Sequence, residues 1–166
     1  MSNEYEKKRE ILKDLILREE DVLAQLQRIA TLAKPFLRIE ESTGRVVLSD
    51  GFQFANTEKI FVFLLGKYLA FHSGITKETT VSISDISDGV GVVITTLSAP
   101  IKRLVDDHIA ERPEKDTYRV NPHKIESNLQ NMRRKYVYAE EPTRDKGSIS
   151  PNPFGKTKFD EVIGRQ

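Results

Sequence analysis

Residues 81–132 carry the pattern that decides the fold, and they read VSISDISDGVGVVITTLSAPIKRLVDDHIAERPEKDTYRVNPHKIESNLQNM. Their apolar and turn-forming residues predict a short strand, two short helices, a two-stranded hairpin and a closing helix, in that order. Ser82 and Asp85 have the spacing of a capping box, which begins the first of these helices. Gly91 permits the tight turn after it. Asn121, followed by a proline, begins the closing helix.

The second helix of this stretch is constrained by Pro100. Proline is tolerated in the first turn of a helix but costs ~3 kcal/mol in its interior. We therefore expect the helix to begin late, near Thr95 or Thr96, with Thr96 or Ser98 as its cap, and to run to about Asp107. Its inward side carries an apolar stripe: Leu97, Ile101, Leu104 and Val105.

The order of these elements resembles the winged helix-turn-helix superfamily over residues 57–138. That fold is used chiefly to place a helix in the major groove of DNA, and it also serves as a protein-binding module. The resemblance implies that residues 109–112 and 117–120 are the wing strands, with residues 113–116 as the tip. It also makes His108 the residue with a left-handed backbone that ends the second helix.

The resemblance further implies a DNA-contacting surface on the outward side of the second helix and on the wing. Hydroxyls and free amides at the start of such a helix reach phosphates and base edges, and basic side chains contact phosphates. The chain departs from the family at Val93 and Ile94, where a polar cap is usual. The residues expected to contact DNA are Thr95, Thr96, Ser98, Lys102, Arg103, Arg112, Lys115 and Arg119.

The N-terminal segment, residues 1–35, is predicted to be one amphipathic helix over residues 4–34. It contains no glycine or proline before Pro35, and it carries an interrupted apolar stripe: Leu12, Leu15, Val22, Leu26, Ile29 and Ala33. The stripe fits either a helix that lies on its own domain or the seam of a coiled-coil dimer.

A hairpin and a central helix are expected next. Residues 36–56 hold two short alternating strands around a turn with a glycine at position 44, followed by a connection. Thr57 is expected to cap a helix that is apolar on most sides, and Gly74 to end it. The predicted fold class is therefore mainly α with small β elements (α+β), with a winged helix-turn-helix core behind an N-terminal helix and a β-hairpin.

Residues 139–166 form the last region, a charged tail with many glycines and prolines that is predicted to be largely irregular. Apolar residues return near its end. If this tail docks onto its own domain or onto a protein partner, the anchors are Phe154, Phe159, Val162 and Ile163.

Composition and motifs argue against several classes of protein. The chain has no cysteine, no Gly-rich phosphate loop, and three histidines that fall on separate predicted helix ends, so we expect no enzyme, no metal and no cofactor. The first residues lack the apolar core of a signal peptide. The longest apolar run, residues 60–65, is far shorter than the ~20 residues that cross a bilayer. The expectation is a soluble, cytoplasmic protein without a membrane partner.

The charge balance leaves two functions open. Formal net charge is +1, and residues 57–135 hold twelve Lys and Arg against ten Asp and Glu, whereas DNA-binding domains usually have a pI above ~9. The first hypothesis is a DNA-binding transcriptional regulator that forms a homodimer through residues 4–34 and/or 122–138. The alternative is a protein-interaction subunit or adaptor without sequence-specific DNA binding. A coherent positive stripe on the outward helix face favours DNA, and mixed charge favours protein.

Overall fold

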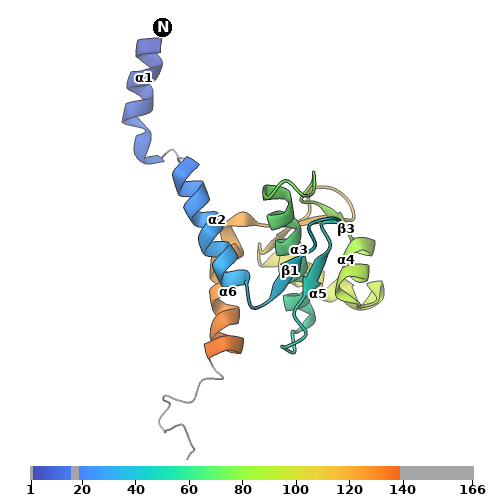
Figure 1. Cartoon of the computed structure of the whole chain (residues 1–166). Helices are drawn as coiled ribbons and strands as arrows, with labels where there is room; N and C mark the ends of the chain where they lie inside the picture. Colours follow the sequence, from blue (N-terminus) through green and yellow to red (C-terminus); the bar gives the residue numbers. More distant parts are fainter. Residues whose placement is uncertain (1, 16–18, 139–166) are drawn as a thin grey trace, which may run out of the picture.

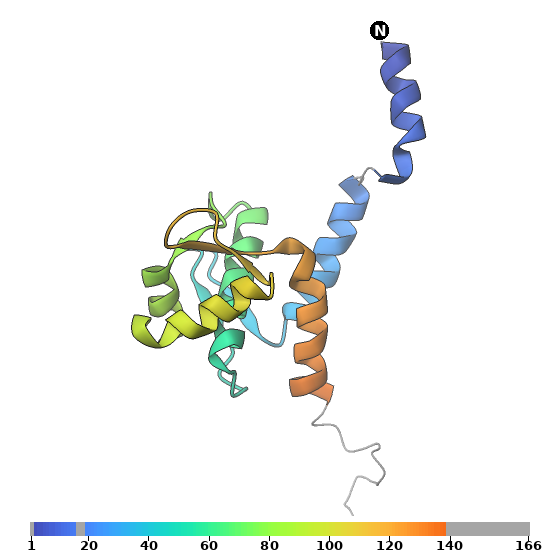
Figure 2. The same cartoon turned by 180° about the vertical axis from the view of Figure 1, so that it is seen from behind.

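The computed structural model describes residues 2–15 and 19–138. The chain is mainly helical with two small antiparallel sheets, so the predicted α+β class is confirmed. The N-terminal helices α1 and α2 and the closing helix α6 lie on one side, and the remaining elements pack together on the other (Figure 1). The view from behind in Figure 2 gives the same arrangement.

The N-terminal region is two helices, which corrects the prediction of one continuous helix over residues 4–34. Helix α1 spans Ser2–Ile11, a 3-10 turn η1 spans Lys13–Leu15, and α2 spans Glu19–Ala33. Two basic residues, Lys8 and Arg9, lie in the last turn of α1, and three acidic residues lie in the first turn of α2. Such charges favour a helix end and a helix start because they complement the helix dipole, so the charge pattern supports a break that the apolar stripe alone does not reveal.

The hairpin predicted after this region is confirmed. Strand β1 (Leu37–Ile39) pairs antiparallel with β2 (Val46–Leu48), and Leu37 lies opposite Leu48. Gly44 in the turn has a φ of 75°, the left-handed conformation that glycine adopts without strain. The hairpin packs on α3 so closely that a Cβ built on Gly66 would lie 2.5 Å from the Val46 side chain.

Helix α3 (Asn56–His72) is the centre of the core. Residues 60–66 are all buried, and Gly74 follows the helix with a φ of 84° as expected. The predicted cap at Thr57 is wrong, because the cap residue is Ala55 and has no side-chain oxygen. Instead the Glu58 carboxylate accepts a hydrogen bond from the Ala55 amide at 2.8 Å, which satisfies one of the free donors at the helix start.

The elements after α3 follow the order predicted from residues 81–132. They are β3 (Val81–Ser82), α4 (Ile83–Val90), α5 (Ile94–Asp106), β4 (Ala110–Glu111) and β5 (Thr117–Val120). The strands form an antiparallel sheet in the order β3-β5-β4. The capping box is present, since the Asp85 amide donates to Ser82 Oγ at 3.0 Å, and Gly91 and His108 have left-handed backbones as predicted.

Helix α5 begins at Ile94, earlier than the predicted start at Thr95 or Thr96. Its cap is Val93, which offers no side-chain hydrogen bond, and Pro100 lies inside the helix. The missing proline amide costs the helix one bond to the carbonyl of Thr96, a residue exposed to water. Burial of the apolar stripe offsets that cost, because Leu97, Ile101 and Leu104 are each at most 4% exposed. Packing therefore overrides the local capping preference.

The closing helix has three parts. A 3-10 turn η2 (Pro122–Lys124) begins with the Asn121 side chain accepting from the His123 amide, α6 spans Ile125–Arg133, and a π-helical segment η3 spans Arg134–Tyr138. The predicted stripe is largely confirmed: Ile125, Leu129 and Met132 are buried, and Tyr136 is half-buried. Tyr136 packs edge-on against Phe54, with ring centroids 5.4 Å apart.

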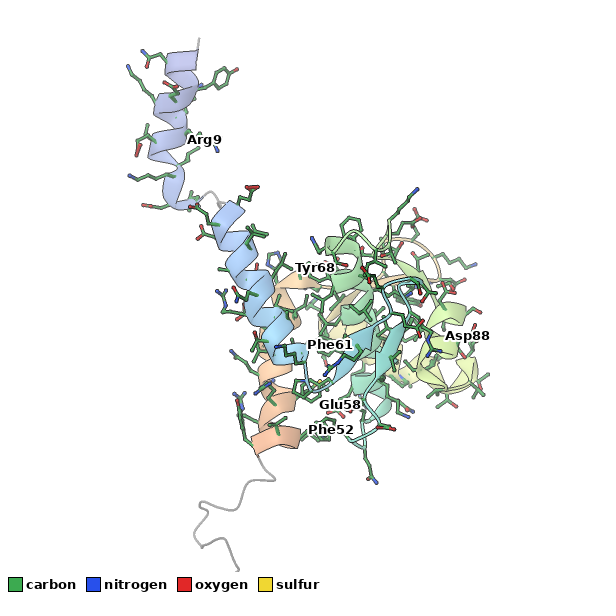
Figure 3. All side chains as sticks on the ribbon, viewed as in Figure 1. Arg9, Phe52, Glu58, Phe61, Tyr68 and Asp88 are labelled. Carbon is green, nitrogen blue, oxygen red and sulfur yellow. The ribbon has the colours of Figure 1, made fainter. Side chains whose placement is uncertain are left out.

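The end of this helix is tied to the start of α3 by Glu58. Lys135 Nζ donates to its carboxylate at 3.0 Å, and the Tyr136 hydroxyl donates to it as well. Burial raises the pKa of Glu58, but the hydrogen bonds from Tyr136, the Ala55 amide and Lys135 outweigh it and lower the pKa below the ordinary value for glutamate. Figure 3 places Glu58 close to Phe52, which joins the same aromatic cluster.

Replacing Glu58 with Gln should destabilise the fold by about 1 kcal/mol at neutral pH, because a neutral amide makes weaker bonds to these donors. The lowered pKa means that the wild-type advantage is present above the ordinary pKa of glutamate and is lost as pH falls through the folded-state pKa. Denaturant unfolding of both proteins between neutral and acidic pH measures it. A difference that stays constant on acidification would contradict the assigned role.

Gly89 offers a test of the contact between α4 and α3. Alanine normally stabilises a helix interior by up to ~1 kcal/mol over glycine, but a Cβ at Gly89 would lie 2.1 Å from the Phe63 ring. We therefore expect Gly89→Ala to destabilise by about 1–3 kcal/mol. Ser84→Ala, at an exposed position of the same helix, is the matched control and should be neutral or slightly stabilising in the same thermal unfolding measurement.

Candidate nucleic-acid interface

The start of α5 is presented to solvent. Thr95, Thr96 and Ser98 are all exposed, as predicted for an outward face. The amides of Ile94 and Thr95 precede any acceptor within the helix, so they remain available to an anion or to water. The turn between α4 and α5 and the segment between β4 and β5 both lie at the end of the molecule away from α2 and α6 (Figures 1 and 2). The first part of the predicted site is therefore accessible.

Lys102 is also exposed, but it is already paired. Its Nζ lies 2.8 Å from Asp106 Oδ2, one turn further along α5. The hydrogen bond to Asp106, with the attraction of its negative charge, raises the pKa of Lys102 above its ordinary value. At about 100° per residue, Asp106 falls opposite the buried Leu97, so a carboxylate occupies the middle of the outward face.

Arg103 points away from Lys102. It lines a hollow of about 190 Å³ between α3, α5 and α6, whose other polar residues include Glu58, Asp107 and Asn131. Within the described residues, Arg103 forms no ion pair. The sequence predicted that Lys102 and Arg103 both lie on the outward side of this helix and contact DNA. The structure places them on different flanks of the helix.

The β4–β5 hairpin is likewise mixed in charge. Arg119 Nε lies 2.8 Å from the Glu111 carboxylate on the neighbouring strand, and Arg112 lies 3.9 Å from Asp116 across the tip. Lys115 is exposed and, among the residues that the structure describes, has no carboxylate partner. Of the five basic side chains predicted to contact DNA, three are thus paired to acids and two are not.

The structure also exposes two apolar residues at this end that were noted in the sequence only because they cannot cap a helix. Val93 is 65% exposed and Ile94 43% exposed, directly before Thr95. No polar signal marks them, but two β-branched residues between a turn glycine and a helix start could have identified an apolar tip. The Lys102–Asp106 pair was likewise readable from its spacing of four residues.

Within the described residues, the remaining predicted features add no further site. Over residues 2–15 and 19–138, no group of three or more potential ligands is arranged to hold a metal ion, and no helix is long and apolar enough to cross a membrane. His72 packs beside the Tyr68 ring at the end of α3. The proposed docking anchors of the C-terminal tail lie outside the described residues: Phe154, Phe159, Val162 and Ile163.

Comparison with known proteins returns no match. No protein-family model, no curated protein and no solved structure corresponds to this chain.

A substitution at Asp106 tests whether the exposed face of α5 contacts DNA. If this face meets phosphates, Asp106→Asn removes a repulsive charge and releases Lys102, so affinity for duplex DNA should rise roughly two- to fivefold. Asp50→Asn removes the same charge at an exposed position beside the end of α2 and should leave affinity unchanged. Fluorescence anisotropy with labelled duplex measures both. A weaker complex for Asp106→Asn would exclude α5 as the phosphate-facing helix.

Proposed function

We propose that this chain is a winged helix-turn-helix protein that binds double-stranded DNA through α5 and the β4–β5 hairpin, and that it acts as a homodimeric transcriptional regulator. One observation carries the proposal: the exposed first turns of α5 and the tip of the hairpin lie at the same end of the molecule, away from α2 and α6 (Figures 1 and 2). This layout suits a helix that enters the major groove beside a hairpin that reaches the flanking backbone.

In this arrangement the start of α5 meets the groove. The hydroxyls of Thr95, Thr96 and Ser98 donate to phosphate oxygens or base edges, and the free amides of the first turn face a phosphate. Lys115, at the hairpin tip, contacts the flanking backbone. Only the contacts to base edges carry sequence information directly, whereas the phosphate contacts, including that of the lysine, set the register of the protein on the duplex.

The ion pairs weaken binding without preventing it. Lys102, Arg112 and Arg119 are paired through side chains that are 40% or more exposed, and exposed pairs are worth about 0–1 kcal/mol each. Replacing the carboxylate partner of such a basic side chain with a DNA phosphate therefore costs little free energy. The expected complex is modest in affinity and sensitive to salt, with the repulsion from Asp106 and Asp116 limiting it.

A second candidate, a winged-helix subunit or adaptor that binds protein, has its own support. The charge on the outward face is mixed, and Val93 and Ile94 expose apolar surface beside it. Desolvating an apolar tip on a partner protein is favourable, whereas DNA offers only thymine methyl groups for such contact. This candidate becomes the better one if duplex DNA does not bind.

The positions of Lys102 and Arg103 provide the test. Lys102→Ala should weaken binding roughly three- to tenfold and reduce the salt slope by about one, since one phosphate contact is lost. Arg103→Ala should have the smaller effect, because Arg103 lies beside the hollow between α3, α5 and α6. The measurement is anisotropy with random and candidate duplexes at about 50 and 200 mM salt.

Three outcomes separate the candidates. Salt-sensitive binding that depends on Lys102 supports DNA binding through α5. Binding that depends on neither residue overturns the assignment of α5 as the recognition helix. No binding at the lower salt concentration overturns the DNA proposal and leaves the protein-interaction candidate.

A further inference from the structure

Among the described residues, no other element packs over helix α1. Every residue from Asn3 to Leu15 is exposed, and α1 stands clear of the other elements in both views (Figures 1 and 2). Figure 3 shows Arg9 on this helix, away from the core. A helix of ten residues is marginally stable in water without tertiary contacts. Its persistence as a helix is explained if another surface packs against it.

The exposed surface of this region is unusually apolar. Six of the eleven large hydrophobic side chains that are exposed among the described residues lie between positions 5 and 23. Ile11 and Leu15 are 80% and 82% exposed, and Leu23 on α2 is 61% exposed. Scattered single residues of this kind are ordinary, but six within one short segment mark an interaction surface.

The second half of α2 is already occupied. It packs on α6 with Ile29 and Ala33 buried, and Arg28 lies 3.3 Å from the Glu126 carboxylate of α6. The apolar stripe of α6 is buried in the same chain: Ile125, Leu129 and Met132. The surface left for a partner is therefore the N-terminal arm, defined here as residues 2–15 and 19–23.

Two runs of opposite charge lie on this arm, and α1 also carries Glu4, Glu6 and Glu10, with Glu4 lying 4.0 Å from Lys8. Lys7, Lys8 and Arg9 lie on α1, and an acidic block begins α2: Glu19, Glu20 and Asp21. Antiparallel packing of two arms brings the basic run of one copy, with Lys8 and Arg9, against the acidic run of the other, with Glu19 and Glu20. Tyr5 lies one turn before Arg9 on α1 and Leu23 lies one turn after Glu19 on α2, so the same pairing brings these two apolar side chains together.

We propose that the arm pairs antiparallel with the arm of a second copy of this chain, α1 of each copy packing on the start of α2 of the other. A parallel pair would place each charged block against its like and is disfavoured by repulsion. The antiparallel pair is isologous, as a two-fold dimer requires, because the same patch supplies both charge blocks. This assigns the dimer surface within the proposed function but does not depend on what α5 binds.

Charge reversal tests the register in the full chain. Lys8→Glu with Arg9→Glu sets acid against acid, and Glu19→Lys with Glu20→Lys sets base against base, so each double variant should sediment as a monomer where the wild type sediments as a dimer. The quadruple variant restores complementarity and should dimerise again. An equimolar mixture of the two double variants should form a heterodimer, which only pairing between copies can produce.

Controls separate this outcome from unfolding and from general charge effects. Lys77→Glu, at an exposed position between α3 and β3, should remain dimeric. The α1 double variant should keep the wild-type melting temperature, because α1 lies outside the core, whereas the α2 double variant loses favourable charges at a helix start and should melt slightly lower. A wild-type monomer overturns the proposal. Dimers that survive both reversals also overturn it. The two experiments are independent. Loss of dimerisation is measured without DNA, and an absence of DNA binding would not change the sedimentation of the protein alone.

Discussion

Complete burial of helix α3 is the constraint on which the rest of the structure depends. Residues 60–65 are consecutive and all at most 4% exposed, and six consecutive residues point in every direction around a helix. The protein must therefore cover α3 on all sides. The hairpin of β1 and β2, helices α4 and α5, and strand β5 supply this cover. Two glycines, Gly66 and Gly89, permit the closest of these approaches.

The parts of the fold that were predictable from the sequence are those decided by local chemistry. Ser82 and Asp85 make their capping box wherever the helix is placed, and Gly91 and His108 end helices through their own backbone preferences. The start of α5 was not predictable in this way. Val93 is a poor cap and Pro100 a poor helix residue, yet burial of Leu97 and Ile101 extends the helix across both.

The candidate site was predictable as a set of residues but not as a surface. Spacing along a helix identifies Lys102 and Arg103 as outward, and it does not show that a hollow between α3, α5 and α6 lies beside Arg103 alone. The pairing of Arg119 with Glu111 joins two strands whose register depends on the hairpin between them. The break between α1 and α2 was also not predicted. The prediction of one helix rested on the apolar stripe, which does not show where charged residues favour a helix end.

Two residues of the β4–β5 hairpin region adopt a left-handed backbone without being glycine, one shortly before β4 and one in the connection directly before β5. His108 has a φ of 62° and Asp116 a φ of 61°, and this conformation costs an L-amino acid roughly 1–2 kcal/mol. At His108 the Asn121 side chain donates to the carbonyl oxygen at 2.7 Å, which helps to hold the strained backbone. The protein therefore gives up some stability at the entry to this hairpin and at its tip. Its native state lies below the greatest stability that its own packing would allow, and the direction in which the hairpin projects is held by backbone strain as well as by side-chain contacts.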